Sequence, residues 1–294
     1  MKKFLLTLAC CVLSVVVLAV SQSIALAIGG LLVFMKIPAY VCAVVSAILY
    51  SLLTYLGIKF VIAKLFKMNL QEIGIKKFGF SPKWCITAIL LPLAVVTVFI
   101  CMNGDWSVLP EDTYTKITTA VNGIVFYSIS AGIVEEMIFR CAIMGIIRKN
   151  YNIKSAVIIP SVLFGLVHII GNDLDIISII QLVIAGTMVG IMFSLVLLES
   201  SSFWNNALVH ALWNMSTIGL IHIGTESSDL SVYTYVLKSD NNIITGGDFG
   251  IEASVVAVTG YIAVSLVAFL LIKKKQQLRT EKNSPVPVDK TKRI

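Results

Sequence analysis

Charged side chains are scarce in this sequence. Asp, Glu, Lys and Arg make up 13% of the 294 residues, whereas a typical soluble domain has about 25%. Hydrophobic residues make up 57% of the chain, and the mean hydropathy is +0.92. This composition excludes an ordinary soluble globule. It indicates a multi-pass integral protein of the cell membrane, with the lipid bilayer as its surroundings.

Several motifs of other protein classes are absent as well. The sequence has no CxxC pair and no HExxH motif, and it shows no internal repeat of the kind that marks many transporters. The six cysteines lie within or at the ends of apolar runs, so we interpret them as packing residues rather than disulfide partners or metal ligands. They are Cys10, Cys11, Cys42, Cys85, Cys101 and Cys141.

Apolar runs are abundant instead. A helix needs about 20 residues to cross a hydrocarbon core of about 30 Å, and eight runs approach or exceed that length. We therefore predict an all-α fold, a polytopic bundle of about eight transmembrane helices. The predicted spans are residues 4–35, 37–62, 84–102, 117–147, 156–170, 176–198, 203–223 and 251–272.

Basic residues are distributed unevenly among the predicted loops. Most of the 23 Lys and Arg residues lie at the N-terminus, in residues 59–83 and 148–154, and after residue 272. The intervening loops hold only Lys36, Lys116 and Lys238. Because basic loops stay on the cytoplasmic side, both termini are predicted to be cytoplasmic. This topology explains the net charge of +7, and since no folded basic domain is visible we predict no nucleic-acid partner.

The predicted spans divide the chain into five parts. The terminal part, after Leu278, carries prolines among polar residues, so we expect it to be disordered and attracted to anionic lipid. The parts are about three N-terminal spans in residues 1–115, a helical core in residues 116–224, an extracytoplasmic loop in residues 225–250, a last span in residues 251–272 and a basic cytoplasmic tail in residues 273–294.

The first apolar run has a second interpretation. Lys2 and Lys3 precede it, and Ala25 and Ala27 provide small residues of the kind found at a signal-peptide cleavage site. The run is longer than a usual signal sequence and continues to residue 35. We therefore favour an uncleaved span.

The fourth predicted span carries three ionisable residues. Glu135, Glu136 and Arg140 lie in the stretch SAGIVEEMIFRCAIMG, where a charge costs a few kcal/mol and usually serves a site. Glu136 and Arg140 are four residues apart, so they lie one helical turn apart and are predicted to pair. Glu135 lies roughly 140° around the helix from Arg140. It therefore needs another partner.

Two of the three histidines can supply that partner. His168 lies in SVLFGLVHII, one turn after Phe164, which can stack on its ring. His210 lies in NALVHALWNMS, one turn before Asn214. Glu135 and both histidines lie roughly 17 to 21 Å along their helices from the nearest inner charges. We therefore predict one site at a common level, in the inner to middle part of the membrane.

Small residues predict where these helices approach each other. Ser161 with Gly165, and Gly186 with Gly190, have the spacing that permits close helix contact. The third histidine, His222, lies at the outer end of the seventh predicted span without polar company. We interpret it as structural.

The residues of the predicted site carry a family resemblance. EEMIFR, FGLVH and HALWN resemble the EExxxR, FxxxH and HxxxN motifs of the CAAX prenyl protease 2 and bacteriocin-processing family of intramembrane proteases, also called the CPBP or Abi family. All motif positions match, in order. Each motif alone is weak, but the ordered set within apolar spans is specific. The resemblance covers residues 120–216, the greater part of the helical core.

The resemblance implies an endopeptidase that hydrolyses peptide bonds of membrane-associated proteins or peptides. Glu135 would activate water, and His168, His210 and Asn214 would complete the site. We favour a metal-free scheme in which His210 and Asn214 stabilise the oxyanion. Zinc held by Glu135, His168 and His210 is the alternative. The supporting residues would be Glu136, Arg140 and Phe164.

The substrate and two other functions stay open at this point. Relatives in this family act in CAAX-type processing, in bacteriocin maturation or in self-immunity, and the chain has no large extramembrane domain, so we expect access through the membrane or from the cytoplasmic face. A non-catalytic immunity or scaffold protein of the same fold is one alternative. A proton-coupled transporter that uses the same Glu, His and Arg as a relay is the other, although the missing repeat argues against it.

Overall fold

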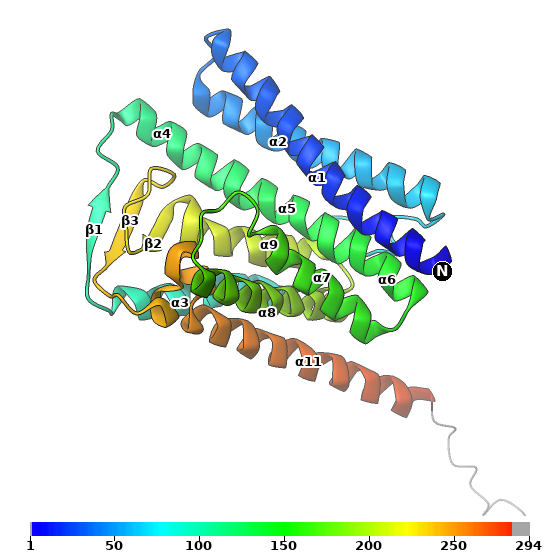
Figure 1. Ribbon diagram of the computed structural model, residues 1–294. Coiled ribbons are helices and arrows are strands. Elements are labelled where there is room, and N and C mark those ends of the chain that lie inside the picture. The colour runs from blue at the N-terminus through cyan, green and yellow to red at the C-terminus, as the bar shows by residue number, and fades with distance from the viewer. Residues whose placement is uncertain (1, 284–294) are drawn as a thin grey trace, which may run out of the picture.

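Helices make up almost all of the regular structure. The computed structural model describes residues 2–283, and its long helices pack side by side as a bundle (Figure 1). The helices are α1 (Lys2–Phe34), α2 (Ala39–Phe60) continued by η1 (Val61–Leu65), α3 (Pro82–Ile100), α4 (Thr113–Asn122), η2 (Gly123–Ser130), α5 (Ala131–Glu135), η3 (Glu136–Ile143), α6 (Met144–Asn150), α7 (Ile153–Val167), α8 (Ile176–Ser200), α9 (Phe203–Asn214) continued by η4 (Met215–Gly219), α10 (Asn242–Thr245), η5 (Gly247–Phe249), η6 (Ile251–Ala253) and α11 (Val255–Asn283).

Six helices of the described chain are long and apolar enough to cross a membrane. The fifth and seventh predicted spans correspond to shorter helices, α7 and α9 continued by η4. The all-α membrane bundle is thus confirmed, whereas eight crossings and cytoplasmic termini stay predictions. The six are Lys3–Phe34, Ala39–Leu65, Pro82–Ile100, Thr113–Asn150, Ile176–Ser200 and Val255–Glu281.

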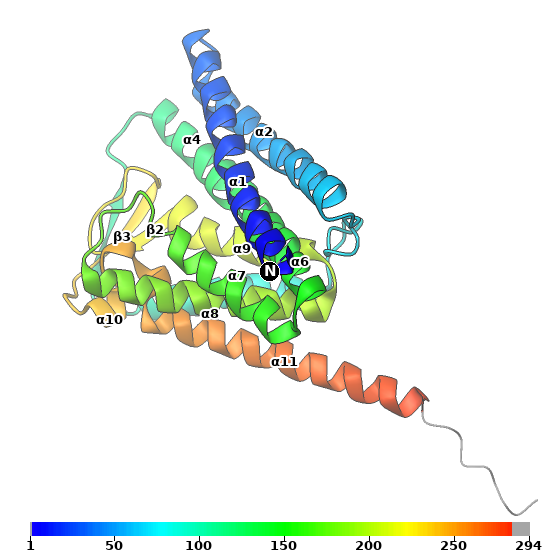
Figure 2. The same cartoon turned by 45° about the vertical axis from the view of Figure 1, so that its right-hand side comes forward.

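The first helix runs without interruption through the possible cleavage site. Ala25 is fully buried, and α1 lies along α2 in both views (Figures 1 and 2). This packing is expected of a transmembrane helix that is not cleaved off as a signal peptide; the uncleaved span stays a prediction.

A small sheet, which the sequence interpretation did not anticipate, lies at one end of the bundle. Its strands are β1 (Gly104–Val108), β2 (Ile221–Gly224) and β3 (Tyr233–Leu237), in the order β1-β3-β2. β1 pairs with β3 antiparallel and β2 pairs with β3 parallel. The segment VYTYVL around β3 is rich in β-branched and aromatic residues, which favour strands. The sheet lies opposite the end at which α1 begins and α11 ends (Figure 1).

The last helix is longer than predicted. α11 extends to Asn283, through the start of the tail that was expected to be disordered after Leu278. Lys, Gln, Leu and Arg are good helix formers, so these residues continue the helix. Residues 284–294 of the predicted tail, with Pro285 and Pro287, lie outside the described residues.

Close contact between α7 and α8 follows from small residues, as predicted. A Cβ atom on Gly186 would lie 2.5 Å from the Cα of Gly165. One on Gly190 would lie 2.7 Å from the Cα of Ser161. Because no side chain fits between them, the two backbones touch, and α7 and α8 lie side by side in both views (Figures 1 and 2).

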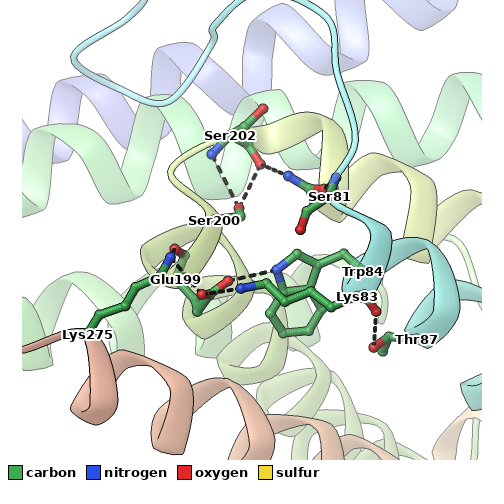
Figure 3. Close-up of polar contacts among 9 residues, drawn as sticks. Ser81, Lys83, Trp84, Thr87, Glu199, Ser200, Ser202 and Lys275 are labelled. Atoms are coloured by element: carbon green, nitrogen blue, oxygen red, sulfur yellow. Dashed lines mark hydrogen bonds and ion pairs between the residues drawn. The ribbon is translucent and has the colours of Figure 1, made fainter. Parts of the chain in front are cut away.

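A buried carboxylate joins three helices at the end of the bundle away from the sheet. Glu199, near the end of α8, accepts hydrogen bonds from Lys83 and Trp84 of α3 (Figure 3). Lys275 of α11 forms an ion pair with the same carboxylate at 2.7 Å and also donates to the Glu199 carbonyl. The Glu199 side chain is fully buried, whereas the lysines are about half exposed. Glu199 thus holds α3, α8 and α11 together.

Replacing this carboxylate should weaken the bundle. Glu199→Gln removes the charge that attracts two lysines, and a hydrogen bond to a charged group contributes about 2 kcal/mol. We expect a lower melting temperature of the purified protein in detergent. Glu226→Gln, in an exposed loop, should melt like the parent. Equal melting temperatures for both variants would contradict the proposed role of Glu199.

Candidate functional site

The three ionisable residues of the fourth predicted span lie in the rod that runs from α4 to α6. Over Glu136–Ile143 this rod widens to π-helical geometry, which is uncommon and often occurs at functional sites. The predicted pairing is present: Arg140 Nε lies 3.5 Å from Glu136 Oε2, and both side chains are fully buried.

Glu136 has two further partners from α9. Its Oε1 accepts from His210 Nδ1 at 3.1 Å, and its Oε2 accepts from Asn206 Nδ2 at 3.1 Å. The Asn206 amide also donates to the carbonyl of Phe193 on α8. Glu136 therefore connects the rod to α9, and Asn206 connects α9 to α8.

The Arg140 guanidinium lies among aromatic rings. Its Cζ is 4.7 Å from the ring centre of Phe164 and 5.7 Å from that of Phe193. Within the described residues its Nη1 and Nη2 have no hydrogen-bond partner. Cation–π attraction therefore assists Glu136 in stabilising this buried charge.

Glu135 faces the two histidines rather than Arg140. Its Oε2 lies 3.9 Å from His168 Nε2 and 3.7 Å from His210 Nε2. The Glu135 side chain is 19% exposed, in contrast to its fully buried neighbour. No described residue forms a hydrogen bond with Glu135 Oε2.

Both imidazoles are oriented by their other nitrogen. His168 Nδ1 lies 2.7 Å from the Phe164 carbonyl, which can only accept, so Nδ1 carries a hydrogen. His210 Nδ1 bonds the Glu136 carboxylate in the same way. In each neutral ring the Nε2 then presents a lone pair toward Glu135. Three acceptors converge without a donor, so this geometry calls for a proton, a water molecule or a cation between them.

The remaining predicted residues surround this point. Phe164 lies 4.5 Å from His168 between ring centres, as the sequence suggested. Asn214 is buried, and its Nδ2 donates to the carbonyl of Tyr127 at 3.0 Å. The second amide hydrogen of Asn214 has no partner in the described structure.

Two residues beside His210 were not predicted from the sequence. Phe193 stacks on the His210 ring at 4.9 Å between centres, and nothing in the local sequence marks it. Asn206 could have been found, because it precedes His210 by four residues and Asn214 follows by four, which puts all three on one face of α9.

A cavity of about 560 Å³ contains the site. Glu135, His168, His210 and Asn214 all line it. His222, interpreted from the sequence as structural, lies on β2 and also lines it; burial lowers its pKa. His168 directly follows α7, which ends at Val167, and the inner to middle level of the site stays a prediction.

The predicted zinc ligands lie farther apart than two ligands of a tetrahedral zinc ion. Two ligands of one tetrahedral zinc lie about 3.3 Å apart, whereas Glu135 Oε2 is 3.7 and 3.9 Å from the two Nε2 atoms. Over residues 2–283, no three His, Cys, Asp or Glu side chains form a group that could hold a metal ion. Zinc held by Glu135, His168 and His210 stays the alternative prediction.

Fold and site together define a multi-pass integral membrane protein whose helix bundle contains a cavity with ionisable side chains in its lining. Residues 117–216 match the family described as Rce1-like, type II CAAX prenyl endopeptidase. This match includes all three motifs and confirms the family resemblance. At family level it supports a CAAX-type intramembrane protease. No curated protein and no solved structure matches the chain.

The contacts of Glu136 predict how its loss should appear. Glu136→Gln leaves Arg140 buried without its counter-charge, which costs on the order of 3 kcal/mol. We expect lower yield and a lower melting temperature in detergent, and weaker activity because the contact with His210 changes. The exposed Glu111→Gln should behave like the parent. A Glu136→Gln protein that is fully stable but wholly inactive would instead give Glu136 a direct chemical role.

Proposed function

We propose that this protein is an intramembrane endopeptidase in which Glu135 activates water. The observation that carries the proposal is the convergence of Glu135 Oε2 with the Nε2 atoms of His168 and His210. A water molecule held there can donate one hydrogen to the carboxylate and the other to an imidazole. Its oxygen lone pairs are then free to attack a peptide carbonyl.

The proposed reaction uses only side chains of this chain. Glu135 takes the proton as water attacks, and a tetrahedral intermediate forms. His210, whose Nδ1 is bonded to Glu136, donates a hydrogen bond to the oxyanion in the form of the ring that carries a proton at Nε2 in place of the lone pair. The free amide hydrogen of Asn214 is a second donor. Glu135 then gives its proton to the leaving amine.

His168 has a different part in this scheme. It is the more exposed of the two rings, with 29% of its side chain accessible against 6% for His210. Its Nδ1–H bond to Phe164 fixes the ring, so Nε2 can hold and align the attacking water. Phe164 in turn separates His168 from Arg140.

The substrates proposed are membrane-associated proteins or peptides, in CAAX-type processing or in maturation and self-immunity of peptide bacteriocins. A non-catalytic immunity or scaffold protein, or a proton-coupled transporter, would keep the same buried residues but would not cleave peptide. Turnover by purified protein separates these functions.

Removing the base should abolish cleavage without unfolding the protein. Glu135→Gln keeps the shape of the side chain, and Glu135 Oε2 has no hydrogen bond to lose in the described structure. We expect an unchanged melting temperature and a rate lowered by about two to three orders of magnitude. The assay is peptide cleavage in detergent, with Glu226→Gln as the active control. A Glu135→Gln protein that still cleaves would refute the assignment.

Metal removal tests the alternative chemistry. We expect purified protein to keep full activity after dialysis against a chelator, because the proposed steps need no metal. Loss of activity that zinc restores, with about one equivalent bound, would instead make Glu135, His168 and His210 ligands.

A further inference from the structure

The cavity around Glu135 extends toward the loops at the sheet end of the bundle, and it also reaches Leu18, Gln22 and Tyr50 on α1 and α2. Several lining residues lie outside the long helices, in loops, strand β2 and the short helices η5 and η6, and all of these are at the sheet end of the bundle. These residues are Asn172, His222, Ser228, Leu230, Asp248, Phe249 and Glu252. None of the lining residues comes from residues 59–83, residues 148–154 or the part of α11 after residue 272.

In the opposite direction, packed side chains separate Glu135 from a second cavity of about 510 Å³, which reaches Arg140. Glu136, Phe139, Arg140 and Ile143, the next turns of the rod, are all 0 or 1% exposed. Phe193 covers His210 from α8 at 1% exposure. These buried side chains lie between Glu135 and the end of the bundle at which α1 begins.

Charge distinguishes the two ends. The end at which α1 begins and α11 ends carries the basic loops, whereas the sheet end carries loops with Asp173, Asp175, Glu226 and Asp229. By the distribution of Lys and Arg, the sheet end is extracytoplasmic. The cavity itself is lined by Glu135, Asp248 and Glu252 and by no Lys or Arg.

Asp248 is the acidic group at the cavity mouth that substrate would meet. It is exposed, its Oδ2 accepts from the Asp175 backbone N–H at 2.9 Å, and its own N–H donates to Ser178 at 3.0 Å. These bonds fix its carboxylate beside the start of α8. The next residue, Phe249, lies 6.2 Å from the His168 ring between centres. Glu252, by contrast, already accepts from Trp213 and Thr217.

We infer that the site is reached from the extracytoplasmic side and takes polypeptide segments presented there, preferring basic over acidic residues beside the cleaved bond. The inference rests on the proposed function and goes beyond it by naming the side of access and the charge of the substrate. It differs from the expectation of access from the cytoplasmic face. Exported peptides and outer segments of membrane proteins have this location.

Thiol labelling tests the side of access without using catalysis. Ala131 lines the cavity next to Glu135, and Arg148 lies exposed at the other end. In a Cys101→Ser background, Ala131→Cys should react with a membrane-impermeant maleimide in spheroplasts and not in inverted vesicles. Arg148→Cys should show the reverse. Labelling of Ala131→Cys only in inverted vesicles, or only after detergent, would overturn the inference.

Peptide cleavage tests the charge preference. The probes are three soluble peptides that differ at one position, which is Lys, Gln or Glu. With Asp248→Asn we expect KM for the Lys peptide to rise about two- to fivefold, the scale of an exposed ion pair, and KM for the Gln peptide to stay unchanged. Asp229→Asn, outside the cavity, is the matched control. Equal effects of Asp248→Asn on the Lys and Gln peptides would overturn the preference.

The two experiments distinguish failure of this inference from failure of the proposed endopeptidase function. Purified parent that cleaves none of the peptides in detergent would refute the proposed endopeptidase, while the labelling result would still decide the side of access. Cleavage in detergent together with labelling from the cytoplasmic side would keep the enzyme and refute the inference.

Discussion

The buried carboxylate of Glu136 is the group on which both the bundle and the site depend. A guanidinium as fully enclosed as that of Arg140 is costly unless an opposite charge lies beside it, and Glu136 supplies that charge one turn away. The same carboxylate accepts from His210 and Asn206. Charge balance inside the bundle and ring orientation in the site are thus set by one side chain, so neither can be altered alone.

Adjacent glutamates have opposite surroundings because one step along the rod turns the side chain toward a different neighbour. Glu136 is enclosed and fully partnered, which suits it to hold other groups in place. Glu135 lines a cavity and lacks a hydrogen-bond donor in the described structure. A carboxylate in that position has free lone pairs and faces a cavity, as the proposed role of general base requires. The histidines contribute because each has only one nitrogen left for the cavity.

Much of this arrangement could be predicted from the sequence, but only where contacts follow helical spacing. The pairing of Glu136 with Arg140 and the shared face of His210 and Asn214 are separations of four residues. The bond from His210 to Glu136 joins different helices, so no local pattern reveals it. Phe193 was missed for the same reason. The strand β2 was missed because its apolar residues continue the run of the helix before it, and short apolar runs do not distinguish helix from strand.

The position of the sheet connects the two ends of the molecule. α9, which carries His210 and Asn214, continues through η4 directly into β2, and β2 is joined through β3 to β1. β1 follows α3, whose other end is held by Glu199. α9 therefore leads into strand β2 at one end, and at its other end it begins shortly after Glu199 of α8. Rigid elements of this kind can hold catalytic groups in place, and the loops beside the sheet line the cavity that contains Glu135.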